Sequence, residues 1–247
     1  MSEERKSICS LDGNMLKIIA AVCMLIDHIG VRIFPEAIIL RIIGRMSFPI
    51  FAFMIAEGCR YTKNKLRYFL SVFLLGAACQ IVYYLYDESL DMCILITFSL
   101  SILIIYAMQD FKNAIFCPQS TPLEKILSGA LFLTSIALTF VLNKCFSIDY
   151  GFVGCILPVF AALFHQPSKN SSKLLQKLDH RYIHIAMMGV ALLVYSLRSS
   201  WVQMFSLFAI PLLLLYSGKR GKGNTKYLFY VFYPAHLAIL EAIAVLL

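Results

Sequence analysis

The sequence predicts an all-α fold, a polytopic transmembrane helical bundle of about nine spans with a cytoplasmic N-terminus. The 247 residues are 60% apolar and only 15% charged, whereas a soluble domain is about half apolar and roughly a quarter charged. The apolar residues fall in segments of about 17 to 22, close to the ~20 that a helix needs to cross a bilayer. The cations gather in a few of the loops between these segments, which is the pattern of a topology signal.

The same composition excludes several classes of protein. Strands of a β-barrel porin would alternate apolar and polar residues over only about 10 positions. Seven of the eight cysteines lie in or beside hydrophobic runs, and no CxxC pair occurs, so we interpret them as small packing residues and not as a disulfide framework. The first apolar run is too long for a signal-peptide core and is a retained span. The basic residues that give the net charge of +8 cluster in the loops. This placement is typical of a protein in contact with membrane lipid, and it indicates no nucleic-acid partner.

One membrane domain, residues 1–247, contains all the predicted spans. Each apolar run is long enough to cross a bilayer if it is lightly tilted. The runs lie near residues 15–34, 38–59, 66–86, 92–109, 126–143, 149–165, 181–197, 201–217 and 227–246.

The cations set the orientation of these spans. Three clusters follow the second, sixth and eighth spans: Arg60, Lys63, Lys65, Arg67; Lys169, Lys173, Lys177, Arg181; and Lys219, Arg220, Lys222, Lys226. The opposite side receives the acidic stretch Asp87, Glu88, Asp91 and scattered cations such as Lys144 and Arg198. The positive-inside rule therefore places the N-terminus in the cytoplasm and the C-terminus outside.

Four ionisable residues fall in one slab in the outer half of the predicted spans, where charge is costly and such residues are functional candidates by default. Asp27 and His28 lie about 9 to 10 Å from the outer end of the first span, Arg45 lies at nearly the same depth in the second, and His236 lies about 15 Å deep in the last. Asp27 and Arg45 could form a purely structural ion pair. Two membrane-buried histidines are harder to explain by packing, because leucine would pack better at each position.

The second span also carries Pro49, which predicts a kink and freed carbonyls beside a polar cavity. Glu57 lies near the cytoplasmic face with Arg60 three residues later, so the two could form an ion pair at the helix end. The alternative is a cytoplasmic portal for an anionic cosubstrate such as a nucleotide or coenzyme A. The candidate cofactor-binding residues are Glu57, Arg60, Lys63, Lys65 and Arg67.

Three other histidines, His165, His180 and His184, have no nearby Cys or carboxylate in a ligand pattern, so we interpret them as interfacial and predict no metal site. Asp149 and Tyr150 precede Gly151 at the outer end of the sixth span. We interpret them either as the start of a helix or as part of the outer mouth of a cavity. Tyr233 belongs to an aromatic stretch at the start of the last helix, where an aromatic belt is expected.

Several of these motifs together resemble the TraX family of integral-membrane proteins, whose name comes from the conjugative F-pilin acetylase. The resemblance covers nearly the whole chain in order. It rests on Met24-Leu25-Ile26-Asp27-His28-Ile29-Gly30, Gly44-Arg45, Phe48-Pro49-Ile50-Phe51, Glu57-Gly58, Tyr68, Gln80, Thr97-Phe98-Ser99-Leu100, Asp149-Tyr150-Gly151-Phe152 and Phe229-Tyr230-Val231-Phe232-Tyr233-Pro234-Ala235-His236-Leu237.

The resemblance implies a multi-pass N-acetyltransferase of the bacterial cytoplasmic (inner) membrane that uses acetyl-CoA as cosubstrate and no metal. In the family, the pilin enzyme acetylates the N-terminal amine of processed pilin during conjugation. The acceptor here is expected to be a pilin-like protein amine, or a hydroxyl or amine of an envelope acceptor. Candidate substrate-binding residues are Asp149, Tyr150 and Tyr233.

Acyl transfer needs a base for the attacking group and donors for the developing oxyanion. We expect His28 to be the base, because an imidazole titrates near neutrality. Asp27 is about 100° around the helix from His28, so it is expected to fix Arg45 instead. Arg45, or a backbone N–H near Pro49, is the candidate oxyanion donor. His236 is the candidate second base or acyl carrier, and the two histidine roles are interchangeable at this level.

Two rival functions fit part of the pattern. Asp27, His28, Arg45 and His236 could form the proton relay of a proton-coupled transporter. A structural assembly factor for a secretion or conjugation apparatus would tolerate substitution at both histidines. Dependence on acyl-CoA separates the enzyme from the transporter.

Overall fold

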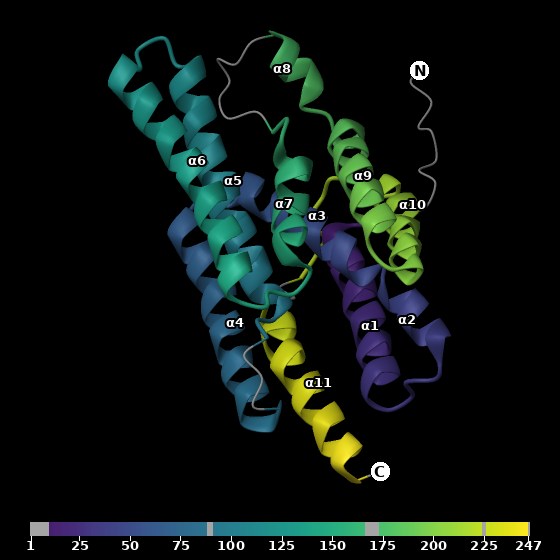
Figure 1. Ribbon diagram of the computed structural model, residues 1–247. Helices are drawn as coiled ribbons and strands as arrows, with labels where there is room; N and C mark the ends of the chain where they lie inside the picture. The colour runs from purple at the N-terminus through teal and green to yellow at the C-terminus, as the bar shows by residue number, and fades with distance from the viewer. Residues whose placement is uncertain (1–9, 88–90, 166–172, 224–225, 247) are drawn as a thin grey trace, which may run out of the picture.

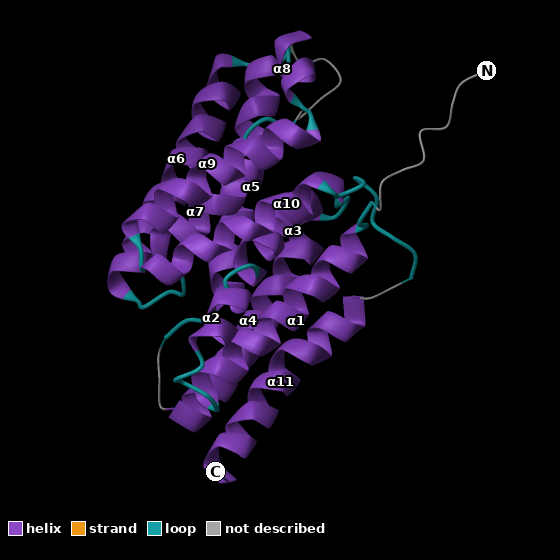
Figure 2. Ribbon diagram, turned by 90° about the vertical axis from the view of Figure 1, so that its right-hand side faces the viewer, coloured by secondary structure: helices purple, strands orange, loops and turns teal. Residues whose placement is uncertain are grey.

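Each of the nine predicted segments contains a helix in the computed structural model, which describes residues 10–87, 91–165, 173–223 and 226–246 (Figure 1). No strand occurs in those ranges (Figure 2), where two isolated bridges are the only β contacts. The all-α prediction is therefore confirmed for the described residues. Glu88 of the predicted acidic stretch and Lys169 of the second cationic cluster lie outside them.

The first half of the chain forms α1 (Gly13–Arg32), α2 (Ile38–Gly44), α3 (Ser47–Tyr61), α4 (Lys65–Asp87), α5 (Ile94–Phe116) and α6 (Pro122–Cys145). The second half forms α7 (Gly151–Ala162), α8 (Lys173–Leu178), α9 (Arg181–Arg198), the 3-10 helix η1 (Trp201–Phe208), α10 (Ala209–Leu214) and α11 (Lys226–Leu246).

Five helical segments are long and apolar enough to cross a membrane: Gly13–Arg32, Ile38–Tyr61, Lys65–Val82, Ile94–Phe116 and Pro122–Cys145. Three further apolar helical stretches are shorter, namely Gly151–Ala162, Trp201–Leu214 and Val231–Leu246. Several membrane-length helices in one chain indicate a multi-span membrane protein.

The core of the bundle lies along α3 and α5. Phe53, Ile102 and Ile105 are almost completely buried there. By contrast, Thr139 is the one buried residue of α6, while Leu123 is 72% exposed and Leu133 is 66% exposed. An apolar helix that points most of its side chains away from the protein is expected where lipid replaces water. The outer helix α6 therefore has a lipid-facing surface.

The break between α2 and α3 agrees with the prediction of a kink caused by Pro49, because the missing N–H of Pro49 would have bonded the Arg45 carbonyl one turn earlier. The helix bends before that residue, at Arg45 and Met46, where the Met46 N–H donates to the Ile43 carbonyl at 3.3 Å as in a 3-10 turn. Pro49 is the third residue of α3. A residue in the first helical turn needs no intrahelical N–H donor, so proline is tolerated there.

The N-terminal end of α1 is attached to the loop that follows α10. Asp12 caps α1 by accepting from the Met15 N–H at 2.9 Å. The Gly13 N–H donates to the Lys219 carbonyl at 2.8 Å. Gly221 has φ +90°, and a Cβ there would lie 2.4 Å from the Asp12 carboxylate, so only glycine fits. This attachment brings the loop against α1.

The last helix, α11, packs between α1 and α4 and extends to the end of the bundle opposite α8 (Figure 1). The Arg32 guanidinium contacts the Glu241 carboxylate at 2.6 Å and joins α1 to α11. Residues from the two ends of the chain therefore form one side of the bundle.

Two native cysteines test the predicted orientation, because they lie at opposite ends of α6. Cys117 precedes the helix and Cys145 ends it, and 24 residues of helix rise about 36 Å. The backbone N–H of Gln119 and the Ser120 side chain lower the pKa of the Cys117 thiol, which favours labelling. In variants that keep one of the two thiols, a membrane-impermeant maleimide should label Cys145 in intact spheroplasts and Cys117 only after lysis.

A resident cytoplasmic thiol protein controls for leakage in this experiment. Labelling of Cys117 before lysis, with Cys145 protected, would reverse the orientation. Equal labelling of both thiols in sealed spheroplasts would show that α6 does not cross.

Candidate functional site

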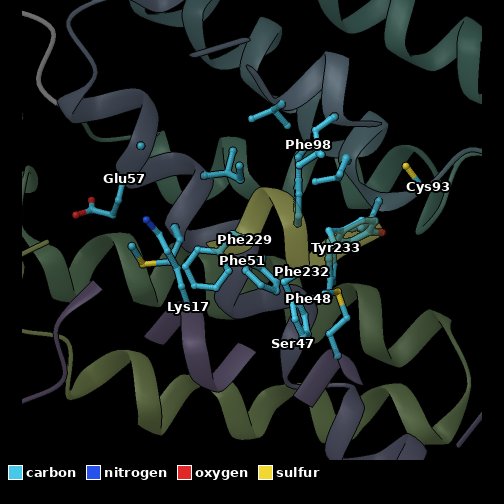
Figure 3. Close-up of a pocket in the computed structure, with 18 of the residues that line it drawn as sticks. Lys17, Ser47, Phe48, Phe51, Glu57, Cys93, Phe98, Phe229, Phe232 and Tyr233 are labelled. Carbon is cyan, nitrogen blue, oxygen red and sulfur yellow. The ribbon is translucent and has the colours of Figure 1, made fainter. Parts of the chain in front are cut away.

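A cavity of about 980 Å³ lies inside the bundle, at the upper end of the range of roughly 300 to 1,000 Å³ usual for ligand pockets. Its wall includes Lys17 and His28 of α1, which are 11 positions apart, or about 16 Å of helix. It also includes Ser47 and Glu57 of α3 (Figure 3). The cavity is therefore elongated along these two helices.

The two ends of the cavity differ in chemistry. Lys17, Arg67 and Arg220 line one end, which we name the basic mouth. Asp27, His28, Arg45, Asp149 and Tyr150 line the other end. Aromatic side chains also line the cavity, and Figure 3 shows Phe51, Phe229 and Phe232 between Lys17 and Tyr233. The arrangement suits an elongated ligand with an anionic end and a reactive end.

His28 and His236 form a hydrogen-bonded dyad whose proton positions follow from the network. His236 Nδ1 lies 2.8 Å from the Phe232 carbonyl oxygen, which can only accept. His236 Nδ1 therefore carries the proton and Nε2 carries the lone pair. His28 Nδ1, at 2.8 Å from that Nε2, must donate to it. The lone pair of His28 is then on its Nε2.

The cavity distinguishes the two histidines, which the sequence could not. His28 lines it and His236 does not. The His236 ring stacks on Phe232 at 4.7 Å between centroids and contacts the edge of Tyr233 at 5.5 Å. This packing fixes His236 on the side of His28 that faces away from the cavity. From there the His236 ring sets the tautomer and orientation of His28 through their hydrogen bond.

An arginine cluster, formed by Asp27, Arg41 and Arg45, lies beside the dyad. The Asp27 carboxylate accepts from Arg45 Nη2 at 2.8 Å and from Arg41 Nη1 at 2.8 Å. The predicted contact between Asp27 and Arg45 is present. Arg41 is a partner that the sequence reasoning missed, although its spacing of four residues from Arg45 places both on one helical face.

Two further residues complete the surroundings of this cluster. Arg45 Nη1 donates to Gln203 Oε1 of η1 at 3.4 Å, a contact with no sequence signal. At Gly44 a Cβ would lie 2.2 Å from the Asp27 carboxylate. Glycine at this position therefore allows α2 to approach α1 closely enough for the ion pair to form.

The three predicted substrate-binding residues, Asp149, Tyr150 and Tyr233, all line the cavity. Tyr150 has φ +60°, the left-handed conformation that a non-glycine residue rarely adopts, at a cost of roughly 1 to 3 kcal/mol. Its ring stacks on Phe48 at 3.8 Å between centroids. Thr97 Oγ1 donates to the Asp149 carbonyl at 2.7 Å and fixes the same turn.

Only two of the five residues predicted for the cytoplasmic portal line the cavity. Glu57 and Arg67 line the cavity, whereas Arg60, Lys63 and Lys65 do not. Lys65 contacts Asp110 at 2.6 Å. Lys17 and Arg220 line the mouth instead, and Arg220 reaches it because its loop binds the start of α1.

The predicted ion pair between Glu57 and Arg60 is replaced by other contacts. Arg60 Nη2 donates to the Asp179 carboxylate at 3.0 Å. Glu57 lies against His165 at 3.6 Å and within a buried group that also contains His184. Sequence spacing could not show this, because the three residues come from distant parts of the chain. His180 is exposed, as an interfacial residue would be. The interfacial interpretation is wrong for His165 and His184, which are buried beside a carboxylate.

These features define a class: a helical membrane protein with an elongated cavity, a histidine dyad and an arginine cluster. The chain belongs to the TraX family, because the family model described as TraX protein matches residues 12–244. The predicted family membership is therefore confirmed.

Two relatives extend this finding. Over 241 residues the chain is 25% identical to a probable fimbrial assembly protein FimC, serogroup H1, of Dichelobacter nodosus, covering 91% of this chain and 92% of that protein. Over 103 residues it is 37% identical to an uncharacterized protein of Rickettsia prowazekii (strain Madrid E), covering 41% of this chain and 38% of that protein. No solved structure matches the chain significantly.

A substitution at Gly44 tests whether the close approach of α2 supports the ion pair. Gly44→Ala places a methyl group against Asp27 and should lower the free energy of unfolding by about 2 to 4 kcal/mol, because it separates buried charges. Thermal unfolding in detergent measures this change.

Gly189→Ala in α9 is the matched control. Its new methyl group would meet Ile210 at an ordinary 3.5 Å, and alanine favours a helix over glycine by up to about 1 kcal/mol. Equal melting temperatures for Gly44→Ala and the unmodified protein would show that the contact at Gly44 is not needed.

Proposed function

We propose that the protein is a membrane-embedded acetyltransferase that takes its acetyl group from acetyl-CoA. The observation that supports this most is His28, whose unprotonated Nε2 belongs to a side chain lining an elongated cavity with a basic mouth. In the proposed orientation the nine spans place the mouth in the cytoplasm, where acetyl-CoA is made, and the chain resides in the bacterial inner membrane.

The basic mouth would bind coenzyme A. The phosphates of coenzyme A would contact Lys17, Arg67 and Arg220, while the pantetheine arm would follow the aromatic wall. A negatively charged head and a long, narrow arm match a cavity that is cationic at one end and apolar along its middle. The thioester would then reach the end that His28 lines.

His28 supplies the chemistry. The acceptor amine or hydroxyl attacks the thioester carbonyl carbon as its proton passes to His28 Nε2. The tetrahedral intermediate then expels the coenzyme A sulfur, which takes up the proton from His28, so His28 returns to its starting state. His236 contributes by holding His28 in the tautomer that leaves Nε2 unprotonated.

The arginine cluster would stabilise the oxyanion that forms during this attack. Two guanidinium groups share one carboxylate, so the cluster carries one excess positive charge. A fixed positive charge in a cavity of low dielectric stabilises a developing negative charge without reorganisation. Asp149, at the same end, would accept a hydrogen bond from the neutral acceptor amine or hydroxyl and orient it.

The comparison with known proteins favours one class of acceptor. A relative over nearly the whole chain is named as a probable fimbrial assembly protein, which favours a pilin-like protein amine. An envelope hydroxyl or amine is the other acceptor class.

Substitution of the two histidines tests the catalytic proposal. With labelled acetyl-CoA and a membrane extract, His28→Ala should reduce acetyl transfer by about 10²- to 10⁴-fold, the range for loss of a general base. His236→Ala should reduce it less, because the His28 ring remains. His180→Ala, which changes an exposed histidine, should keep full activity. Full transfer by both dyad variants, in folded protein, would refute the assignment.

Substitution at the mouth separately tests cosubstrate binding. Lys17→Ala and Arg220→Ala should each raise KM for acetyl-CoA by about tenfold, roughly 1.4 kcal/mol, with little change in kcat. Lys63→Ala removes an exposed cation outside the cavity wall and should leave KM unchanged. An equal effect of all three variants would indicate general electrostatics and not a binding site at the mouth.

The hydrogen-bonded dyad also favours a second candidate, a proton-coupled transporter. The hydrogen bond between His28 Nδ1 and His236 Nε2 could pass a proton from one ring to the other inside the membrane. Solute flux in proteoliposomes that follows a proton gradient without acetyl-CoA would support this candidate over the enzyme.

A further inference from the structure

A second cluster of titratable side chains lies apart from the histidine dyad. Glu57 of α3, His165 just after α7 and His184 of α9 each offer one metal-binding atom, and these atoms lie within 4.8 Å of one another. All three are deeply buried, at 5%, 2% and 1% exposure. The His165 and His184 rings meet edge to face at 4.5 Å between centroids.

The ring nitrogens of this cluster lack hydrogen-bond partners. Within the described residues, neither nitrogen of His165 and neither nitrogen of His184 has one. A neutral imidazole carries one N–H donor and one acceptor, and leaving a buried polar group unsatisfied costs about 1 to 3 kcal/mol. Two adjacent buried histidines whose ring nitrogens form no well-directed hydrogen bond are therefore suited to bind a ligand through their lone pairs.

We propose that Glu57, His165 and His184 bind a divalent transition-metal ion, with Zn²⁺ as the best match. Imidazole nitrogen and carboxylate oxygen are both zinc ligands, and bond lengths of about 2.0 to 2.1 Å in a tetrahedron place neighbouring ligand atoms roughly 3.4 Å apart. His165 Nε2 and Glu57 Oε1 are 3.6 Å apart. An ion bound by Glu57, His165 and His184 would occupy the lone pair of one nitrogen on each of the two imidazole rings.

The surroundings of the cluster fit a metal site as well. Ligating carboxylates and histidines usually have outer partners that fix them. Tyr216 Oη donates to Glu57 Oε2 at 3.4 Å, leaving Oε1 toward His165. Asp179 Oδ1 lies 3.2 Å from His184 Nε2, and Arg60 contacts the same carboxylate. Asp179 can therefore complete the coordination or orient His184.

The ion would have a structural role. It would join α3, the end of α7 and α9 at one point, and Glu57 and Tyr216 also form part of the cavity wall. His28, His236 and the arginine cluster take no part in it. The metal proposal therefore stands independently of acetyl transfer, and its test measures metal content.

Metal content of the purified protein is the first test. Full-length protein in detergent, loaded with Zn²⁺ and passed over a desalting column, should retain about one zinc per chain by elemental analysis. His165→Ala and His184→Ala should lose it, and His180→Ala, an exposed histidine in the same region, should keep it. Zinc retained equally by all four proteins, or absent from the unmodified protein, would overturn the proposal.

A rescue experiment keeps the proposal testable if the alanine variants fail to fold. His184→Cys replaces one zinc ligand by another and should retain the ion, whereas His184→Gln should not. Loading with Co²⁺ in place of Zn²⁺ should give the strong visible absorption of a tetrahedral thiolate complex in His184→Cys only. Monodisperse His184→Cys without that absorption would exclude His184 as a ligand.

Discussion

The pairing of Asp27 with two arginines is the contact on which the functional end of the cavity depends. A carboxylate inside a membrane protein must be paired, because no water compensates for its charge. Here Asp27 is placed between Arg41 and Arg45, and this contact requires the close approach of α1 and α2 that Gly44 permits. That approach in turn holds α1 so that His28, the next residue, reaches the cavity.

The dyad extends this constraint to α11. His28 and Arg32 lie one turn apart on α1, and they contact His236 and Glu241 on α11. Hydrophobic side chains contribute little specificity between helices in lipid, because the tails are equally apolar. Two polar contacts along one seam therefore fix the register of α11 against α1, and with it the position of the aromatic residues that line the cavity.

The sequence predicts the helices and four of the membrane-embedded polar residues, because apolar run length and the cost of intramembrane charge are local properties. Asp27, His28 and Arg45 were found by that reasoning, and so was His236. Contacts between distant segments had no such signal. Arg220 reaches the mouth beside Lys17 only because its loop folds onto α1. Glu57 meets His165 and His184 only through the packing of distant segments.

The separation of 208 residues between His28 and His236 has a consequence for synthesis of the protein. At about 5 to 20 residues per second, a ribosome needs roughly 10 to 40 s to reach the second histidine after the first. Asp27 meets Arg41 and Arg45 after only 14 and 18 residues, so the first hairpin can enter the membrane with its carboxylate already compensated. His28 is without its partner until the last helix is inserted, and the end of the cavity that contains the histidine dyad is therefore completed last.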